Sequence, residues 1–249
     1  MQNGFVEIIL GCSRELSMNQ LQSIAKAVLP SQVQKVLLAP HRDFVFDRAM
    51  KRFLSNPDAC KQPRNPVLID LIYGWGNKGW SALDEYLAAC IEHALTSNGP
   101  ILECGSGLST LLLGAIAQKQ GRSHWALEHT PEWATRVQHY LNRYQLDAVV
   151  LCSTPLKDYG DFCWYEAPLA SMPDSFSLVI CDGPPGATKG GRYGLVPIMS
   201  DRLKSGCVIL LDDAEREQER TIAARWQAEL GASFETLGPN KPFIEMTLH

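Results

Sequence analysis

Residues 100–110 read Pro-Ile-Leu-Glu-Cys-Gly-Ser-Gly-Leu-Ser-Thr, an apolar run followed by a glycine-containing turn. The apolar run predicts a short buried strand over 100–104, and Ser109 or Thr110 can cap the helix predicted after it. Between the two elements, Gly105 and Gly107 allow a tight turn and the close approach of a ligand to the backbone. Because ligands of open parallel sheets bind outside the carboxyl ends of the strands, this turn is a candidate binding site.

The alternation of strand and helix continues from this stretch to the C-terminus. A helix is expected before it, over 83–95, and further strands and helices are expected at 123–128, 130 onward, 147–152, 175–182, 192–203, 207–211 and 214–230. Two tail strands, 233–237 and 243–248, are joined by a short turn and predict an antiparallel pair at one edge. The fold class is therefore α/β, with a doubly wound, mostly parallel seven-stranded sheet covered by helices on both faces.

The first 80 residues do not follow this alternation. They contain an apolar segment at 5–10 that suits a strand, helical patterns at 17–28 and 42–54, a proline-rich segment at 55–66, a second apolar segment at 67–73 and a Gly/Trp-rich connector at 74–80. The sequence thus predicts two parts, a helical N-terminal extension over 1–80 and a catalytic domain over 81–249.

Composition and charge narrow the class of protein. The net charge of −4 gives no basic footprint for a nucleic-acid partner. No apolar run is long enough to span a membrane, and the N-terminus lacks the pattern of a secretory leader. Eight cysteines occur without metal-binding spacing, several of them inside apolar runs, which is typical of a reducing compartment. We therefore expect a cytoplasmic protein without membrane or nucleic-acid partners.

An acidic residue closes the second predicted strand. Glu128 lies 23 residues after Gly105, where a carboxylate can accept both ribose hydroxyls of a bound nucleoside. His129 follows and can meet the edge of the nucleoside. Thr110 stands where a dinucleotide fold usually has its third glycine, so an adenosine derivative without a pyrophosphate is the expected ligand.

Together, the stretch 103–110, the acid Glu128 and the later segment Cys181-Asp-Gly-Pro-Pro-Gly186 resemble a class I S-adenosylmethionine-dependent methyltransferase of the small-molecule or O-methyltransferase branch. The resemblance extends from about residue 75 to the C-terminus. It implies S-adenosylmethionine as cofactor, with the ribose at Glu128 and the adenine near residues 153–156. The residues that it places around the cofactor are Glu103, Gly105, Ser106, Gly107, Ser109, Glu128, His129, Pro155, Leu156 and Asp182.

Three aspartates follow the fourth and fifth predicted strands. Asp182 ends a buried apolar strand, and Asp212 and Asp213 end the next one. A carboxylate at this edge is a candidate for base catalysis, and three of them suit a hard cation such as Mg²⁺. Alternatively, Asp212 and Asp213 cap the helix that follows them. Arg192 is a second catalytic candidate, since it can hold an anionic group of the substrate, and it can equally pair with Asp182 or Asp213.

These features predict a methyltransferase that acts on a small-molecule acceptor, at oxygen, by in-line transfer. The alternatives are an NAD-dependent oxidoreductase, a transferase using a relative of the same cofactor, and a non-catalytic protein that binds S-adenosylmethionine. In many members of the family that the sequence resembles, the segment before the first strand covers the substrate pocket. We therefore expect the extension to set acceptor choice or to form a homodimer.

Overall fold

A seven-stranded sheet in the order β3-β2-β1-β6-β7-β9-β8 lies at the centre of the computed structural model, which describes residues 31–76 and 82–249. The expected strand at 5–10 and helix at 17–28 fall outside these residues. The strands are β1 (Ile101–Cys104), β2 (His124–Glu128), β3 (Val149–Ser153), β6 (Phe176–Cys181), β7 (Leu203–Leu211), β8 (Ser233–Leu237) and β9 (Phe243–Thr247).

The first five of these strands run parallel, whereas β9 runs antiparallel to both of its neighbours, β7 and β8. The predicted seven-stranded sheet and its antiparallel tail pair are confirmed. Because β9 enters between β7 and β8, the turn that joins β8 to β9 returns to the carboxyl end of β7. That return brings the β8–β9 turn to the ligand edge of the sheet.

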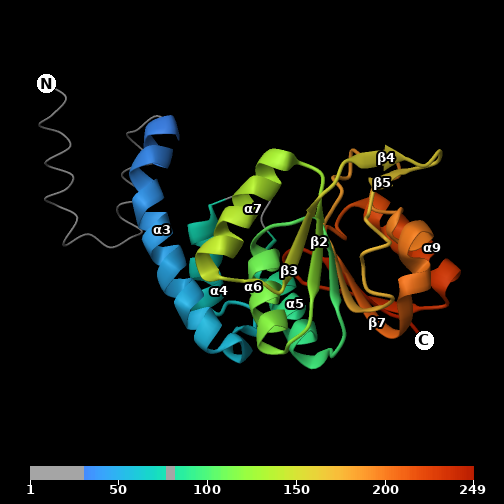
Figure 1. Cartoon of the computed structure of the whole chain (residues 1–249), viewed down its shortest axis with the longest axis horizontal. Coiled ribbons are helices and arrows are strands. Elements are labelled where there is room, and N and C mark those ends of the chain that lie inside the picture. The colour runs from blue at the N-terminus through green and yellow to red at the C-terminus, as the bar shows by residue number, and fades with distance from the viewer. Residues whose placement is uncertain (1–30, 77–81) are drawn as a thin grey trace, which may run out of the picture.

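Helices cover both faces of the sheet (Figure 1). One face carries α5 (Asp84–Thr96), α6 (Leu108–Lys119) and α7 (Pro131–Tyr144), and α3 (Ser31–Ser55) and α4 (Pro66–Trp75) pack outside them. The other face carries α9 (Glu217–Leu230) and the short α8 (Leu195–Met199). Two 3-10 turns complete the helical elements, Pro57–Cys60 and Ser200–Arg202.

Alternate side chains of each central strand enter two different cores, as the two-residue period of a strand requires. In β6, Leu178 and Ile180 pack against the α5–α6 side, whereas Val179 and Cys181 pack against the α8–α9 side. Both faces of the sheet are therefore apolar, which explains why the central strands read as continuous apolar runs.

The N-terminal helices differ from the prediction in extent. α3 is 25 residues long and contains Pro40, and the apolar segment at 67–73 is the helix α4 rather than an unassigned run. The signals for α4 are present in the sequence: the Asn65 side chain accepts a hydrogen bond from the Val67 amide, and Pro66 occupies the first helical position.

Three other expectations need correction. The helix expected over 192–203 is limited to α8, because Gly190, Gly191 and Gly194 shape a loop that buries Arg192 against the sheet. Strand β7 begins at Leu203 rather than at 207. The helix α6 starts at Leu108, so Ser109 and Thr110 lie inside it rather than before it. Apart from these expectations, the segment after β3 contains a hairpin of β4 (Leu156–Asp158) and β5 (Cys163–Tyr165).

Candidate functional site

A cavity of about 910 Å³ lies at the carboxyl ends of β1, β2, β6 and β7. A volume of this size is typical of a small-molecule site. The residues that line it come from the ends of β2 and β5, from the loops after the four strands, from the first turns of α7 and α9 and from the β8–β9 turn: Gly105, Ser106, Glu128, His129, Thr130, Trp133, Tyr165, Asp182, Gly183, Pro185, Gly186, Ala187, Arg192, Asp212, Asp213, Arg216, Gln218 and Lys241.

On one side of the cavity, hydrogen bonds join the turn after β1 to the end of β2. Glu128 accepts hydrogen bonds from the Ser106 amide (3.2 Å) and hydroxyl (2.9 Å) through Oε2, and from the Thr130 amide (2.9 Å) through Oε1. Oε2 already accepts two hydrogen bonds, so Oε1 is the oxygen that keeps acceptor capacity for a ligand. Gly105 has φ +92 and lies against Gly183, so the turn after β1 meets the turn after β6 without an intervening side chain.

Some of the predicted cofactor residues lie elsewhere. Glu103 is buried on the α6 side of β1, where it pairs with His124 at 3.0 Å and accepts a hydrogen bond from the Ser109 hydroxyl at 2.5 Å. Glu103, Gly107, Ser109, Pro155 and Leu156 are not among the described residues that line the cavity. For Glu103 the physical reason is the two-residue strand period, which turns it to the same face as Ile101.

The structure brings the three predicted aspartates together. Carboxylate oxygens of Asp182, Asp212 and Asp213 all lie within 4.8 Å of one another. Two basic side chains of the chain already occupy this cluster. Lys241 Nζ lies 2.7 Å from Asp212 and 2.8 Å from Asp213, and Arg192 lies 3.1 Å from Asp182 and 2.6 Å from Asp213.

Arg192 pairs with the aspartates, which is one of the two alternatives that the sequence left open. Its side chain is 2% exposed, and it also donates to the backbone carbonyls of Asp182 and Asp212. These bonds join the ends of β6 and β7. Arg192 therefore holds the acidic cluster in place, and we treat it as a positioning residue.

Burial and the neighbouring charges shift the pKa values of the three aspartates. Burial raises the pKa of Asp182 to about 7, with Arg192 acting against the shift and Asp212 adding to it. Burial also raises the pKa of Asp212, although Lys241 opposes this change. At Asp213, burial favours the neutral acid, but Arg192 and Lys241 outweigh it and hold the pKa below its ordinary value. The pKa is thus raised at Asp182 and Asp212 and lowered at Asp213.

The cluster does not fit Mg²⁺ as arranged. Lys241 and Arg192 compensate its charge, and Arg216 adds a third positive group at 2.9 Å from Asp213. A divalent ion would have to displace ammonium and guanidinium groups that are already within hydrogen-bonding distance of the oxygens it needs. Carboxylate oxygens are the ligands that Mg²⁺ prefers, but in this cluster they are already paired with Lys241 and Arg192.

Several cavity residues were missed by sequence reasoning. Lys241 was assigned only to a turn, and nothing near it in the sequence suggests a contact with β7. Trp133 lay within a predicted helix, and Tyr165 was not among the predicted site residues. The Tyr165 hydroxyl is buried beside Gly183 and has no hydrogen-bond partner among the described residues. Burial holds the pKa of Tyr165 well above its usual range, so this phenol stays protonated.

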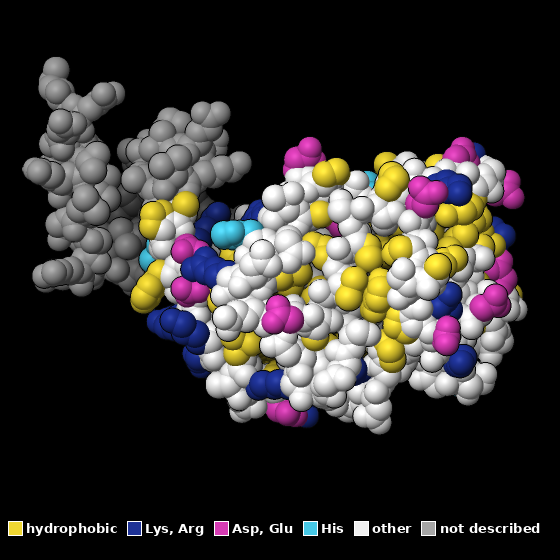
Figure 2. Space-filling view, viewed as in Figure 1, with side chains coloured by type: hydrophobic (Ala, Val, Ile, Leu, Met, Phe, Trp, Pro, Cys, Tyr) yellow, Lys and Arg dark blue, Asp and Glu magenta, His cyan; other side chains and the backbone are white. Residues whose placement is uncertain are grey.

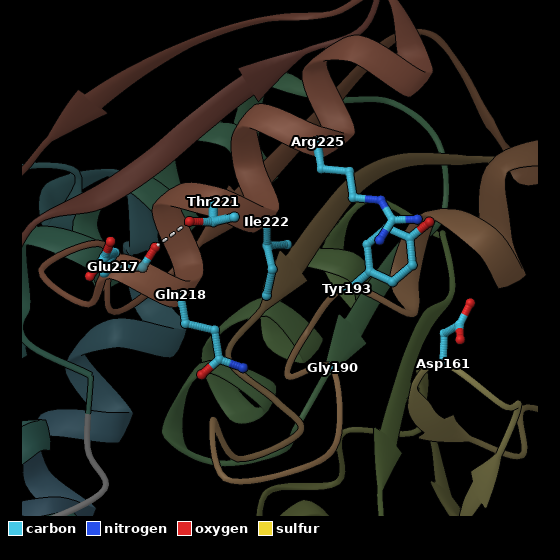
Figure 3. Close-up of a pocket in the computed structure, with 8 residues that line it drawn as sticks. All are labelled: Asp161, Gly190, Tyr193, Glu217, Gln218, Thr221, Ile222 and Arg225. Atoms are coloured by element: carbon cyan, nitrogen blue, oxygen red, sulfur yellow. Dashed lines mark hydrogen bonds between the residues drawn. The ribbon is translucent and has the colours of Figure 1, made fainter.

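A second hollow of about 430 Å³ lies next to the cavity and shares Gln218 with it. Figure 3 shows the guanidinium of Arg225 over the ring of Tyr193, with Gln218 and Ile222 of α9 pointing toward the loop at Gly190. The Arg225 guanidinium carbon lies 3.6 Å from the centre of the Tyr193 ring. This hollow gives the site a mostly apolar extension away from the aspartates.

Comparisons with known proteins bear on the family and the fold of the chain. Residues 102–214 match the sequence model of a family described as "Methyltransferase domain". No curated protein has a significantly similar sequence. Among solved structures, a putative caffeoyl-CoA O-methyltransferase from Staphylococcus aureus has a TM-score of 0.56 at 12% identity, covering 80% of this chain and 99% of its own.

Two further structures share the fold. The SAH-bound methyltransferase PaMTH1 from Podospora anserina has a TM-score of 0.51 at 15% identity, covering 89% of this chain and 98% of its own. Precorrin-6y C5,15-methyltransferase from Geobacter metallireducens has a TM-score of 0.51 at 17% identity, covering 69% of this chain and 91% of its own. At these identities the structural matches show a common fold and say nothing of the acceptor.

The resemblance of the residues 103–110, Glu128 and 181–186 to a cofactor site is thus supported by the family match, by the fold and by the cavity between the strand ends. The Ser106–Glu128 network and the protonated Tyr165 hydroxyl offer acceptors and a donor for a polar nucleoside ligand. Residues 102–214 thus match a family of methyltransferase domains, and the chain shares its fold with known methyltransferases.

Proposed function

We propose that the protein methylates a hydroxyl group of a small molecule and that it does so without a metal ion. S-adenosylmethionine supplies a methyl group on a positively charged sulfur. In the proposed arrangement, Glu128 and Ser106 hold the ribose and the turn at Gly105 lies along the cofactor. The acceptor hydroxyl lies on the side of the cavity formed by Asp182 and Gly183.

The main support for this proposal is the environment of Asp182. Its side chain is 35% exposed to the cavity, whereas those of Asp212 and Asp213 are buried, so it is the carboxylate of the cluster most open to an acceptor. With a pKa of about 7, it can accept the acceptor proton near neutral pH. The rest of the catalytic effect comes from holding the acceptor oxygen in line with the transferred methyl group.

Metal independence follows from the charge of the cluster. The carboxylates of Asp212 and Asp213 are each engaged by Lys241, and Arg192 bridges Asp182 and Asp213. In this proposal the two basic side chains take the place that a divalent ion has in metal-dependent enzymes. They favour the charged forms of Asp212 and Asp213 and hold these carboxylates in place, and they leave Asp182 as the base.

The acceptor is proposed to be a small organic molecule that extends into the hollow between α9 and Gly190. The apolar side chains of Ile222 and Tyr193 suit its distal part. On the described part of the face in Figure 2, Lys and Arg side chains are interspersed with Asp and Glu rather than gathered in a stripe. This distribution supports the proposal that the partner is not a nucleic acid.

Location and assembly remain predictions. Seven described cysteines are free, which supports a reducing, cytoplasmic location. Among the described residues, no helix combines the length and the apolar character needed to cross a bilayer. A homodimer through the N-terminal helices stays a prediction.

A methyl-transfer assay tests the function. Labelled S-adenosylmethionine is incubated with the protein and a panel of hydroxyl-containing metabolites, with Mg²⁺ and with EDTA. We expect transfer to one of them at the same rate in both conditions, and its loss in Asp182→Asn. Loss of activity in EDTA that Mg²⁺ restores would reject the metal-free arrangement. Tight binding of S-adenosylhomocysteine without any transfer would favour a non-catalytic binding protein.

A further inference from the structure

Trp133 of α7 links the cofactor turn to the rest of the molecule. Its indole Nε1 donates a hydrogen bond of 2.6 Å to the Ser106 carbonyl oxygen, and the side chain lines the cavity. Ser106 in turn donates through its amide and hydroxyl to Glu128. The position of the Trp133 ring therefore fixes the main chain at the point where Glu128 faces the ligand.

Arg136, three residues further along α7, lies over the rings of both Trp133 and Trp75, and these three side chains form one stack. Its guanidinium carbon lies 4.9 Å from the centre of the Trp133 ring and 4.7 Å from that of the Trp75 ring. It also donates a hydrogen bond of 2.7 Å to the Trp75 carbonyl oxygen. A planar guanidinium is suited to stacking on aromatic faces while its edge donates hydrogen bonds.

Trp75 is a rigid support for this stack, because it ends α4 and is 2% exposed. The ring centres of Phe46 on α3 and Tyr140 on α7 lie 5.8 Å and 5.0 Å from that of Trp75. Trp75 also meets Trp133 edge to face, with ring centres 5.9 Å apart. A continuous line of contacts thus runs from α3 through Trp75, Arg136 and Trp133 to Ser106.

We propose that the stack of Trp75, Arg136 and Trp133 is a positioning device for the cofactor, through which the helices α3 and α4 set the affinity for S-adenosylmethionine. The proposal gives the N-terminal helices a role in cofactor binding, beyond the acceptor choice expected from the sequence. It rests on the cofactor binding beside Ser106 and Glu128, and it is independent of which acceptor is methylated. Trp75 and Arg136 act through Trp133 and are positioning residues.

The test compares variants of the stack in the full-length protein. Arg136→Ala removes the stacked cation, and Trp133→Phe keeps an aromatic ring but removes the hydrogen bond to Ser106. We expect each to weaken S-adenosylhomocysteine binding at least tenfold by calorimetry. The KM for S-adenosylmethionine should rise by a similar factor, with the KM for the acceptor unchanged. Arg136→Lys keeps the charge without the planar fork and should recover part of the affinity.

Arg143→Ala is the matched control, because Arg143 also joins α7 to α3. It pairs with Asp43 at 2.7 Å and with Asp47 at 2.9 Å, and it does not contact Trp133, Trp75 or Ser106. We expect this variant to bind S-adenosylhomocysteine as the wild type does. Thermal unfolding of every variant verifies that it is folded at the assay temperature.

Three results with the variants would overturn the inference. The first is that folded Arg136→Ala and Trp133→Phe bind S-adenosylhomocysteine as the wild type does. The second is that Arg143→Ala weakens this binding as much as they do, and the third is that their KM for the acceptor rises as much as their KM for S-adenosylmethionine. A wild-type protein that does not bind S-adenosylhomocysteine would overturn it as well. If the wild type binds the cofactor product and the stack variants weaken it, the inference stands even when no hydroxyl acceptor is methylated and the proposed function fails.

Discussion

At the scale of single residues, Asp182 combines exposure to the cavity with a raised pKa. Asp212 and Asp213 are buried and paired with Lys241, whereas Asp182 is partly exposed and pairs with Arg192. This difference in exposure among neighbouring acids is the reason why the proposed function gives the role of base to Asp182. Acidic residues that look equivalent in the sequence can thus differ in pKa and in role, because their surroundings in the folded protein differ.

The pH dependence of the reaction follows from this residue. Below pH 7 Asp182 is mostly protonated and cannot accept a proton, so kcat/KM should rise with pH through about 7 and then level off. Asp182→Asn should lower kcat by about 100-fold to 10,000-fold and leave the affinity for S-adenosylhomocysteine nearly unchanged. Initial rates across pH 5–9 measure the first effect. A flat profile, or full activity in the variant, would contradict the assignment.

Gly105 and Gly107 should respond differently to the same substitution. Gly105 has φ +92, and a Cβ atom there would lie 3.2 Å from the Gly183 amide nitrogen, whereas a Cβ at Gly107 would have no neighbour within 4 Å. Gly105→Ala should therefore cost roughly 1–2 kcal/mol of unfolding free energy, and Gly107→Ala should cost much less. Denaturant unfolding of both variants checks this. Equal losses would mean that the turn tolerates a side chain at residue 105.

At the scale of elements, the turn between β8 and β9 completes the site. Asn240 donates two hydrogen bonds to Glu85 of α5, which anchors the turn, and Lys241 then reaches Asp212 and Asp213. The turn lies at the ligand edge because β9 pairs directly with β7. The β8–β9 turn thus supplies a positively charged side chain, which the residues at the ends of β6 and β7 do not.

Lys241→Met tests the contribution of this turn. The variant leaves Asp212 without its ammonium partner, and we expect a loss of about 1–3 kcal/mol of stability, since Lys241 is partly exposed. Lys241 also lowers the pKa of Asp182. Its removal should therefore move the acidic limb of the pH–rate profile to higher pH. A limb that stays in place or moves to lower pH would separate Lys241 from the base.

At the scale of the whole molecule, the N-terminal helices share a core with the cofactor-binding part. Phe46, Met50 and Trp75 belong to the same buried cluster as Leu111 of α6, Val137 of α7 and Ile180 of β6. A shared core predicts that residues 31–76 and the sheet unfold together. The boundary predicted at residue 80 stays a prediction.

Two phenylalanines of α3 provide the test. Phe46 is 1% exposed and Phe44 is 65% exposed. Phe46→Ala should lower the unfolding free energy of the whole protein by about 3–5 kcal/mol, whereas Phe44→Ala should change it by about 0.5 kcal/mol or less. Circular dichroism and tryptophan fluorescence should follow one coincident transition. A separate early transition in Phe46→Ala would show that α3 and α4 form an independent unit.

The sequence by itself determined the α/β architecture, the order of the strands along the chain and the residues at their carboxyl ends. It could do so because apolar periodicity, glycine turns and terminal acids are local signals. Gly105, Glu128 and Asp182 were found in this way, and each of them lines the cavity. The helix α4 was also signalled locally, by Asn65 and Pro66, although the pattern was not interpreted as a helix.

Only the tertiary structure decided which charges meet and what they do. Lys241 reaches Asp212 across 29 residues of chain, and Arg136 reaches Trp75 across 61, because strand insertion and helix packing bring these segments together. Glu103 is the opposite case. The motif that contains it suggested a contact with the cofactor, but in the folded chain its side chain points toward His124 and pairs with it. Contacts between distant segments depend on the folded chain as a whole, and no local pattern encodes them.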